Sequence, residues 1–164
     1  MRENISMQER KLALYLDTSV IGGYYDDEFA LDTQVLFHEI KDGKYTVVIS
    51  DLTLQELIKA PERVRNLLHD MAIDFEEVMV SPECVELATE YLNEDVVGQT
   101  SRDDCIHIAT ATVNKIDILV SWNFKHIVNV QRIRGYNAVN IKNGYTTLEI
   151  HSPKELRNYE DKEI

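Results

Sequence analysis

Short apolar runs alternate in this chain with longer segments that have the spacing of amphipathic helices. The clearest runs are Leu12–Leu16, Thr46–Ile49 and Ile116–Val120, and weaker extended segments cover residues 75–80 and 146–150. Continuous apolar runs of this length are typical of strands that are buried on both faces, as in parallel sheets. Because parallel neighbours need crossover connections, the alternation predicts an α/β protein whose mainly parallel sheet carries helices on both faces.

The helices are predicted from apolar spacing and from the residues at their ends. We expect them at residues 31–41, from 51 to just before Pro61, and at 62–72, 82–94 and 101–113, with short helices at 124–130 and after 152. Gly22-Gly23 and the acidic stretch 26–28 are assigned to a loop. After the third clear strand the pattern becomes irregular, so the short helix at 124–130 is the only one expected before the last strand.

The length and composition favour one domain. At 164 residues the chain can bury a substantial core, and we expect a single domain over 1–164 with a core of about 12–150, a polar lead 1–11 and a short tail 151–164. The lead has no apolar centre like that of a secretory signal, and charges interrupt every apolar run well before the length of a membrane span. The two cysteines form no disulfide framework. These features predict a cytoplasmic protein with no membrane partner.

The charge is unevenly distributed. The chain has a net charge of −12, which argues against a broad surface that coats nucleic acid. Residues 118–148, however, contain no Asp or Glu and carry Lys125, Arg132, Arg134 and Lys142. This basic segment could hold a phosphate backbone locally, or its cations could simply decorate a loop and a helix.

Acids and amides stand beside the apolar runs. Asp17 directly follows the first strand and Asn123 follows the third clear strand, at the strand ends where function gathers in parallel sheets. Glu56 and Asp104 lie on predicted helices. Two carboxylates about 5 Å apart repel by roughly 3 kcal/mol at an effective dielectric near 20, and a hard cation such as Mg²⁺ or Mn²⁺ reverses that sign. If the fold brings these side chains together, a divalent metal site is expected.

Each of these side chains also has a structural interpretation. Asp17 could cap a helix or turn, Glu56 could face solvent, and Asn123 could form a turn. Ser101 and Asp104 have the spacing of a capping box, although a carboxylate at a helix start can cap and still reach a cation.

Neighbouring residues could support the site. Thr18 and Ser19 offer hydroxyls to orient Asp17 or a bound water, and Asp103 would be a peripheral ligand at most. His107 is interpreted as a structural histidine, because no second His or Cys has the spacing of a zinc site. His126, beside a lysine, could contact a phosphate.

Four motifs in a fixed order give a family resemblance. They are Leu16-Asp-Thr-Ser19, Thr53-Leu-Gln-Glu-Leu57, Asp103-Asp-Cys-Ile-His-Ile-Ala-Thr-Ala111 and Leu119-Val-Ser-Trp-Asn-Phe-Lys-His-Ile127. From about residue 12 to 150 the chain resembles the PIN-domain nuclease family, and within it the small stand-alone bacterial PIN proteins, some of which are VapC-like toxins of type II toxin–antitoxin pairs.

The resemblance implies a three-layer α/β/α sandwich with about five strands and a Mg²⁺- or Mn²⁺-dependent endoribonuclease. Asp17, Glu56 and Asp104 match the family's three core acids and are the expected metal ligands. Asn123 stands where many members have a fourth Asp, so we expect one protein-held cation, with any second one depending on the substrate.

The implied partners are an RNA substrate, an antitoxin protein and a second copy of the chain. The expected contacts to RNA are Lys125, His126, Arg132 and Arg134. The alternative is a catalytically weak PIN domain that acts as an RNA-binding or regulatory module, an interpretation motivated by the missing fourth acid and the acidic composition.

Overall fold

The centre of the fold is a sheet of five strands that all run in the same direction, in the order β3-β2-β1-β4-β5. The computed structural model describes residues 10–160, so most of the predicted polar lead and the end of the tail lie outside the described residues. The strands are β1 (Leu12–Leu16), β2 (Tyr45–Ser50), β3 (Phe75–Val78), β4 (Ile118–Val120) and β5 (Glu149–His151). The predicted parallel sheet of about five strands is confirmed.

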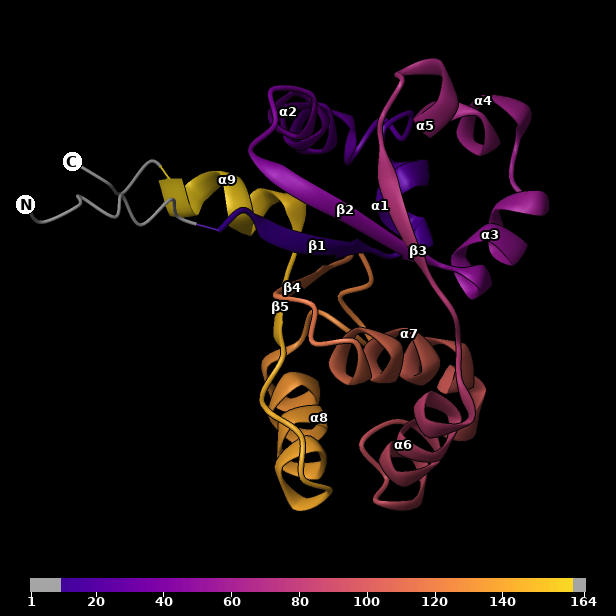
Figure 1. Cartoon of the computed structure of the whole chain (residues 1–164), viewed down its shortest axis with the longest axis vertical. Coiled ribbons are helices and arrows are strands. Elements are labelled where there is room, and N and C mark those ends of the chain that lie inside the picture. Colours follow the sequence, from indigo (N-terminus) through magenta and orange to yellow (C-terminus); the bar gives the residue numbers. More distant parts are fainter. Residues whose placement is uncertain (1–9, 161–164) are drawn as a thin grey trace, which may run out of the picture.

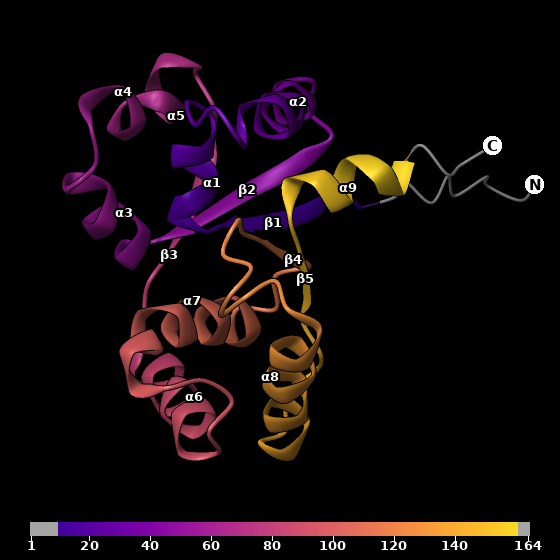
Figure 2. The same cartoon turned by 180° about the vertical axis from the view of Figure 1, so that it is seen from behind.

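Helices cover both faces of this sheet. They are α1 (Thr18–Gly23), α2 (Ala30–Lys41), α3 (Asp51–Ile58), α4 (Glu62–Arg65), α5 (Leu67–Asp70), α6 (Pro82–Asn93), α7 (Arg102–Val113), α8 (Val130–Lys142) and α9 (Pro153–Glu160). Helices α1 to α5 and α9 lie on one side of the sheet, and α6, α7 and α8 lie on the other (Figures 1 and 2). The molecule is therefore the predicted three-layer α/β/α sandwich. Within residues 10–160, no helix is long and apolar enough to cross a bilayer.

The strands are apolar on both faces because each face has its own core. Leu14 and Leu16 of β1 pack on one side in a cluster with Phe37 of α2. Tyr15, between them, packs on the other side with Tyr91 of α6. Successive strand residues point to opposite faces, so a strand between two helical layers must be apolar throughout.

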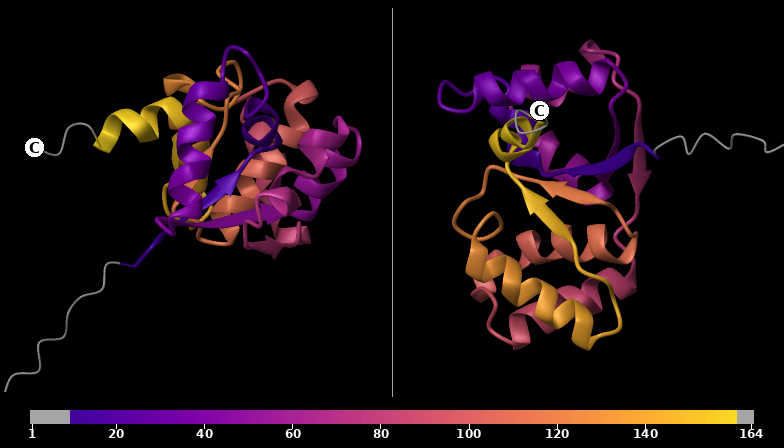
Figure 3. Two further views of the ribbon diagram at one scale, coloured as in Figure 1. Left: turned by 90° about the horizontal axis from the view of Figure 1, so that it is seen from above. Right: turned by 90° about the vertical axis from the view of Figure 1, so that its left-hand side faces the viewer.

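The order of the strands places a crevice at the end of β1. The chain adds β2 and β3 on one side of β1 and then returns to add β4 and β5 on the other, as the two views of Figure 3 show. In open parallel sheets, ligands bind beyond the carboxyl ends of the strands at such a switch point. Here Leu16 pairs with Val120, and the N–H of Asp17 donates to the Val120 carbonyl at 3.0 Å. The polar residues that follow β1 and β4 therefore lie side by side.

In the last third of the chain, one helix prediction was wrong and one helix was missed. Residues 124–128 form turns, and the helix is instead α8, Val130–Lys142. The Asn129 side chain starts it by accepting backbone hydrogen bonds at 3.1 and 3.3 Å. Its inward face includes Gly135, where a Cβ would lie 2.8 Å from a neighbouring side chain, and the fully buried Asn140. A glycine and a polar amide on the buried face hide the apolar spacing from sequence reasoning.

Elements earlier in the chain also differ from the prediction. The helix expected over 62–72 is split into α4 and α5. Helix α1 covers residues that were assigned to a loop because of Gly22-Gly23. Position 23 needs a glycine for a steric reason, because a Cβ would lie 2.7 Å from Nε1 of Trp122. The Trp122 ring is held there by the hydrogen bond that it donates to Thr33.

The two glycines of α1 give a matched stability test. Gly23→Ala is expected to lower the free energy of unfolding by about 1–3 kcal/mol, because the buried Trp122 ring must move. A Cβ at Gly22 meets nothing within 4 Å, so Gly22→Ala should raise the free energy of unfolding, by at most about 1 kcal/mol. Urea unfolding of both variants measures the difference, and equal effects would contradict the steric explanation.

Candidate functional site

Asp17 is held at the end of β1 by hydroxyl groups. Its side chain is buried, with 6% of the residue exposed, and its Oδ2 accepts hydrogen bonds from Ser19 Oγ and Ser121 Oγ, both at 2.8 Å. Although Asp17 is the N-cap residue of α1, its side chain makes no capping hydrogen bond. The carboxylate is therefore held by the two hydroxyls and not by the helix start, and its Oδ1 faces Nε2 of His107 at 3.8 Å.

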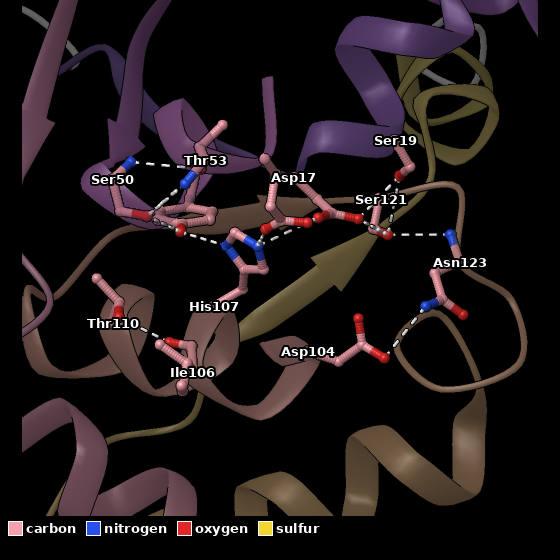
Figure 4. Close-up of polar contacts among 12 residues, drawn as sticks. Asp17, Ser19, Ser50, Thr53, Asp104, Ile106, His107, Thr110, Ser121 and Asn123 are labelled. Carbon is pink, nitrogen blue, oxygen red and sulfur yellow. Dashed lines mark hydrogen bonds and ion pairs between the residues drawn. The ribbon is translucent and has the colours of Figure 1, made fainter. Parts of the chain in front are cut away.

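Asp104 and Asn123 meet across the crevice. Asp104 lies in the first turn of α7, and its Oδ2 accepts a hydrogen bond of 3.4 Å from the Asn123 amide. Figure 4 shows both side chains near Asp17, Ser121 and His107. Asn123 also has the predicted turn role, since its Oδ1 accepts from a backbone N–H at 3.0 Å.

The capping box that the spacing of Ser101 and Asp104 allowed at the start of α7 is absent. Ser101 is buried in a 3₁₀ turn and makes no side-chain hydrogen bond to the helix start. The Asp104 carboxylate is directed to the crevice, so the structural alternative considered for it is not what the fold contains.

Glu56 approaches the same crevice from α3. Its Oε1 accepts a hydrogen bond from Nε2 of His107, and a third of the Glu56 side chain stays exposed, so it does not simply face solvent. His107 itself is buried, and its Nδ1 lies 2.6 Å from the Tyr15 hydroxyl. Side chains from β1, α3, α7 and the loop after β4 thus converge on one place.

The electrostatics of this cluster are unfavourable for its negative charges. Burial, followed by the charges of Asp17 and Glu56, raises the pKa of Asp104 to about 6, although His107 partly offsets the rise. For His107, burial lowers the pKa, but the hydrogen bond to Glu56 and the nearby carboxylates outweigh it and raise the pKa overall. The cluster therefore favours added positive charge.

The raised pKa of Asp104 predicts a pH dependence of stability in the metal-free protein. The pKa of this carboxyl group rises from an ordinary value of 3.8 to about 6 in the folded protein, so between these pH values the unfolded chain gives up the proton first. The stabilising contribution is complete below about pH 4 and is lost as the pH rises through about 6. With EDTA present, the Tm of Asp104→Asn should therefore increasingly exceed that of wild type as the pH rises from 4 to 7. A difference that is constant over this range would contradict the assignment.

The donor chemistry of the cluster fits a hard divalent cation, which prefers oxygen ligands. Asp17 Oδ1 and Asp104 come from two different elements and face the same crevice. Within residues 10–160, however, no three His, Cys, Asp or Glu side chains stand arranged as a complete metal site. Glu56 contacts His107 instead.

The supporting residues named from the sequence have different positions. Ser19 contacts Asp17, whereas Thr18 Oγ1 is buried without a hydrogen-bond partner among the described residues. Asp103 is exposed on α7 and acts on Asp104 only through its charge.

The expected RNA-contacting cations are only partly available. Lys125 and Arg134 are exposed, whereas the Arg132 guanidinium donates to the Val96 carbonyl. The pKa of His126 is lowered by burial and then by the charges of Lys125 and Arg132.

Sequence reasoning missed the residues that hold the carboxylates in place. Ser121 is the first polar residue after β4, and the argument applied to Asn123 would have found it. His107 was interpreted as a structural histidine, and the structure does bury it, but its hydrogen bond to Glu56 could not be read from the sequence. Ser50 is the helix cap that its position before Asp51 indicates, but neither it nor Tyr15, inside β1, carries a signal of the contacts to His107.

An open cavity of about 510 Å³ adjoins the carboxylate cluster. Ser19 and Asn123 belong both to the cluster and to the cavity wall. Trp122 and Arg63 also line the cavity, and the Trp122 ring is stacked on that of Phe29 with 4.3 Å between the ring centroids. None of Asp17, Glu56 and Asp104 lines this cavity, so it extends the site through Ser19 and Asn123.

Comparison with known proteins agrees with this architecture. A family model described as PIN domain matches residues 14–125. Among curated proteins, none matches the sequence. Similar solved structures include VapBC2 from Rickettsia felis, bound to a DNA fragment from its promoter, with a TM-score of 0.57 and 18% identity over 86% of this chain and 98% of that chain.

Two further structures have the same fold. VapC20 from Mycobacterium tuberculosis, described as a sarcin–ricin loop cleaving toxin, has a TM-score of 0.52 and 15% identity over 68% of this chain and 91% of its own. FitAcB from Neisseria gonorrhoeae has a TM-score of 0.54 and 13% identity over 86% of this chain and 98% of its own. At these identities the likeness establishes the fold.

Proposed function

The chain belongs to the PIN domain family, and from this premise we propose that it is a metal-dependent endoribonuclease that hydrolyses RNA phosphodiester bonds. One observation carries the proposal. Asp17 and Asp104, 87 positions apart in sequence, face one crevice at the switch point of the sheet, where their charges repel. A cluster that gains from a cation at the functional edge of a parallel sheet is suited to metal-assisted chemistry on a phosphate.

The residues present could hold one Mg²⁺ or Mn²⁺ ion. Asp17, through Oδ1, and Asp104 would be its direct protein ligands, and Glu56 would act through a water molecule. When bound, the ion makes a bound water more acidic and neutralises charge that develops on the scissile phosphate. Because Asn123 adds no charge, a second ion would depend on the substrate.

The chain's own residues prepare this arrangement. Ser19 and Ser121 donate to Oδ2 of Asp17, which fixes the direction of Oδ1. The Asn123 amide does the same for Asp104. Lys125, exposed in the same loop, would attract the phosphate backbone of RNA to an otherwise acidic surface. Hydrolysis in this family's manner would leave a 5′-phosphate on the product.

A cleavage assay tests the proposal. The purified protein, incubated with single-stranded RNA, should cut it with Mg²⁺ or Mn²⁺ present and stop when EDTA is added, and the products should carry 5′-phosphates. Binding in parallel can be followed through the fluorescence of Trp122, the single tryptophan of the chain, which lines the adjoining cavity.

The same assay decides between the nuclease and an RNA-binding or regulatory module. The module is favoured by Asn123 in the place of a fourth acid and by the lack of a ready-made three-residue metal site within residues 10–160. RNA that quenches Trp122 fluorescence but stays intact with either metal ion would establish the module and refute the nuclease.

We further propose a toxin role in a type II toxin–antitoxin pair, with an antitoxin protein as partner. Support comes from structural neighbours, which include VapBC2 and VapC20, the latter described as a toxin, and from the acidic charge of −12, which would complement a basic partner surface. Induced expression of the wild-type chain should arrest bacterial growth, and Asp104→Asn should not. Equal growth with both would refute the toxin role.

A further inference from the structure

His107 lies in the middle of the carboxylate cluster, yet the proposed hydrolysis gives it no role. Its side chain is 1% exposed. It contacts Glu56 through Nε2 and Tyr15 through Nδ1, and the Tyr15 hydroxyl lies 2.7 Å from Ser50 Oγ. A chain of hydrogen bonds, buried except at its Glu56 end, thus runs from the end of β2 through β1 and α7 to the acid on α3.

The hydrogen-bond partners determine which ring nitrogen carries hydrogen. Glu56 as a carboxylate can only accept, so Nε2 of His107 must carry a hydrogen. At Nδ1 either direction is satisfied, because the hydroxyls of Tyr15 and Ser50 can each donate or accept. Since Nε2 has no free lone pair in either case, His107 is not placed as a metal ligand.

Glu56 needs such a partner more than the other acids do. Asp17 is held by two hydroxyls and Asp104 by an amide, whereas Glu56 lies near the end of α3 with 34% of its side chain exposed. A long, partly exposed side chain loses rotamer freedom when it is fixed. His107, which is buried and anchored by Tyr15, is rigid enough to fix it.

We propose that His107 is a positioning residue that holds Glu56 in one orientation, with Oε1 engaged by the imidazole and Oε2 free for a water bound to the metal. The proposal rests on the nuclease function proposed above and extends it to a buried relay, Ser50–Tyr15–His107–Glu56. Outer partners of this kind typically contribute 10- to 100-fold in metal affinity or activity.

The relay itself can be tested without metal or RNA. In ¹⁵N-labelled wild-type protein with EDTA, the Nε2–H of His107 should give a downfield, slowly exchanging proton signal. Glu56→Ala should abolish this signal and Tyr15→Phe should shift it. A His107 ring whose Nε2 carries no hydrogen in the wild-type protein would overturn the proposal.

The role of the relay is tested by Mn²⁺ calorimetry and by RNA cleavage. His107→Asn cannot reach Glu56 and should weaken Mn²⁺ binding and cleavage by 10- to 100-fold. His107→Gln, whose amide nitrogen can take the place of Nε2, should recover much of the loss. His69→Asn, at an exposed histidine of α5, is the matched control and should behave as wild type.

A double-mutant cycle separates positioning from a merely structural role. In a Glu56→Ala background, His107→Asn should cause no further loss, because no carboxylate remains to be positioned. If the losses of Mn²⁺ affinity and cleavage rate in the double variant are the product of the two single losses, the proposal is overturned. Coupling of ¹⁴N from His107 to bound Mn²⁺ in electron-spin-echo spectra would also overturn it, because His107 would then be a metal ligand. If His107→Asn fails to fold, Tyr15→Phe should give a smaller loss in the same direction, and an unchanged Tyr15→Phe would then refute the relay.

Failure of the nuclease function gives a different result. Wild-type protein that shows the imidazole signal and the Mn²⁺ dependence on His107 but cuts no RNA would leave the positioning role intact and refute the hydrolysis. RNA cleavage at equal rates by wild type and His107→Asn would refute the positioning role and leave the hydrolysis intact.

Discussion

Replacing either Asp17 or Asp104 with Asn is expected to lower the rate of RNA cleavage by roughly a thousand-fold, since the metal contributes several kcal/mol to the transition state and each 1.36 kcal/mol is a factor of ten. Each change keeps the shape of the side chain and removes the charge that would hold the cation. The amide introduced by Asp17→Asn keeps an oxygen for Ser19 and Ser121, so the local hydrogen bonds survive in part.

Folding should survive both changes. Asp104→Asn removes a carboxylate that is destabilised by its burial and by its neighbours, so in EDTA at pH 7 its Tm should equal or exceed that of wild type. The matched control is Asp42→Asn. Asp42 is an exposed acid just before β2, and it therefore lies at the amino-terminal ends of the parallel strands, away from the carboxylate cluster at their carboxyl ends. Initial cleavage rates and thermal unfolding give the result, and wild-type rates from either site variant would show that the acids are wrongly assigned.

Binding of Mn²⁺ is expected to stabilise the folded protein considerably. At a concentration about a hundred times the Kd, a ligand that binds only the folded state adds about 2.7 kcal/mol, or roughly 5–10 °C in Tm for a protein of this size. The physical cause is the relief of repulsion among Asp17, Glu56 and Asp104, a repulsion that adds to burial in raising the pKa of Asp104. EDTA should reverse the shift.

Thermal unfolding at pH 7.5, with and without Mn²⁺, measures this effect, and salt of equal ionic strength controls for general screening. Asp104→Asn should show little of the shift. Cleavage that proceeds in a protein whose Tm does not respond to Mn²⁺ would mean that the cation is not bound by this carboxylate cluster.

Local patterns in the sequence were sufficient for the sheet. The runs at Leu12–Leu16 and at 46–49 are apolar at nearly every position, because both faces of a central parallel strand are covered, and that feature is visible without coordinates. Helix α8 was missed for the complementary reason. Its buried face includes Gly135 and Asn140, whose roles depend on neighbours that are distant in sequence.

The sequence by itself determined the layers, the direction of the strands and the polar residues Asp17 and Asn123 that follow them, since burial and strand periodicity act on neighbouring residues. Only the tertiary structure decided how these acids are held. Ser121 reaches Asp17 across 104 positions and His107 reaches Glu56 across 51, and both contacts exist only because the sheet order puts β4 beside β1 and α7 beneath their ends. A side chain's partner depends on where other segments are folded, so residue type alone could not distinguish a cap, a solvent-facing acid and a held carboxylate.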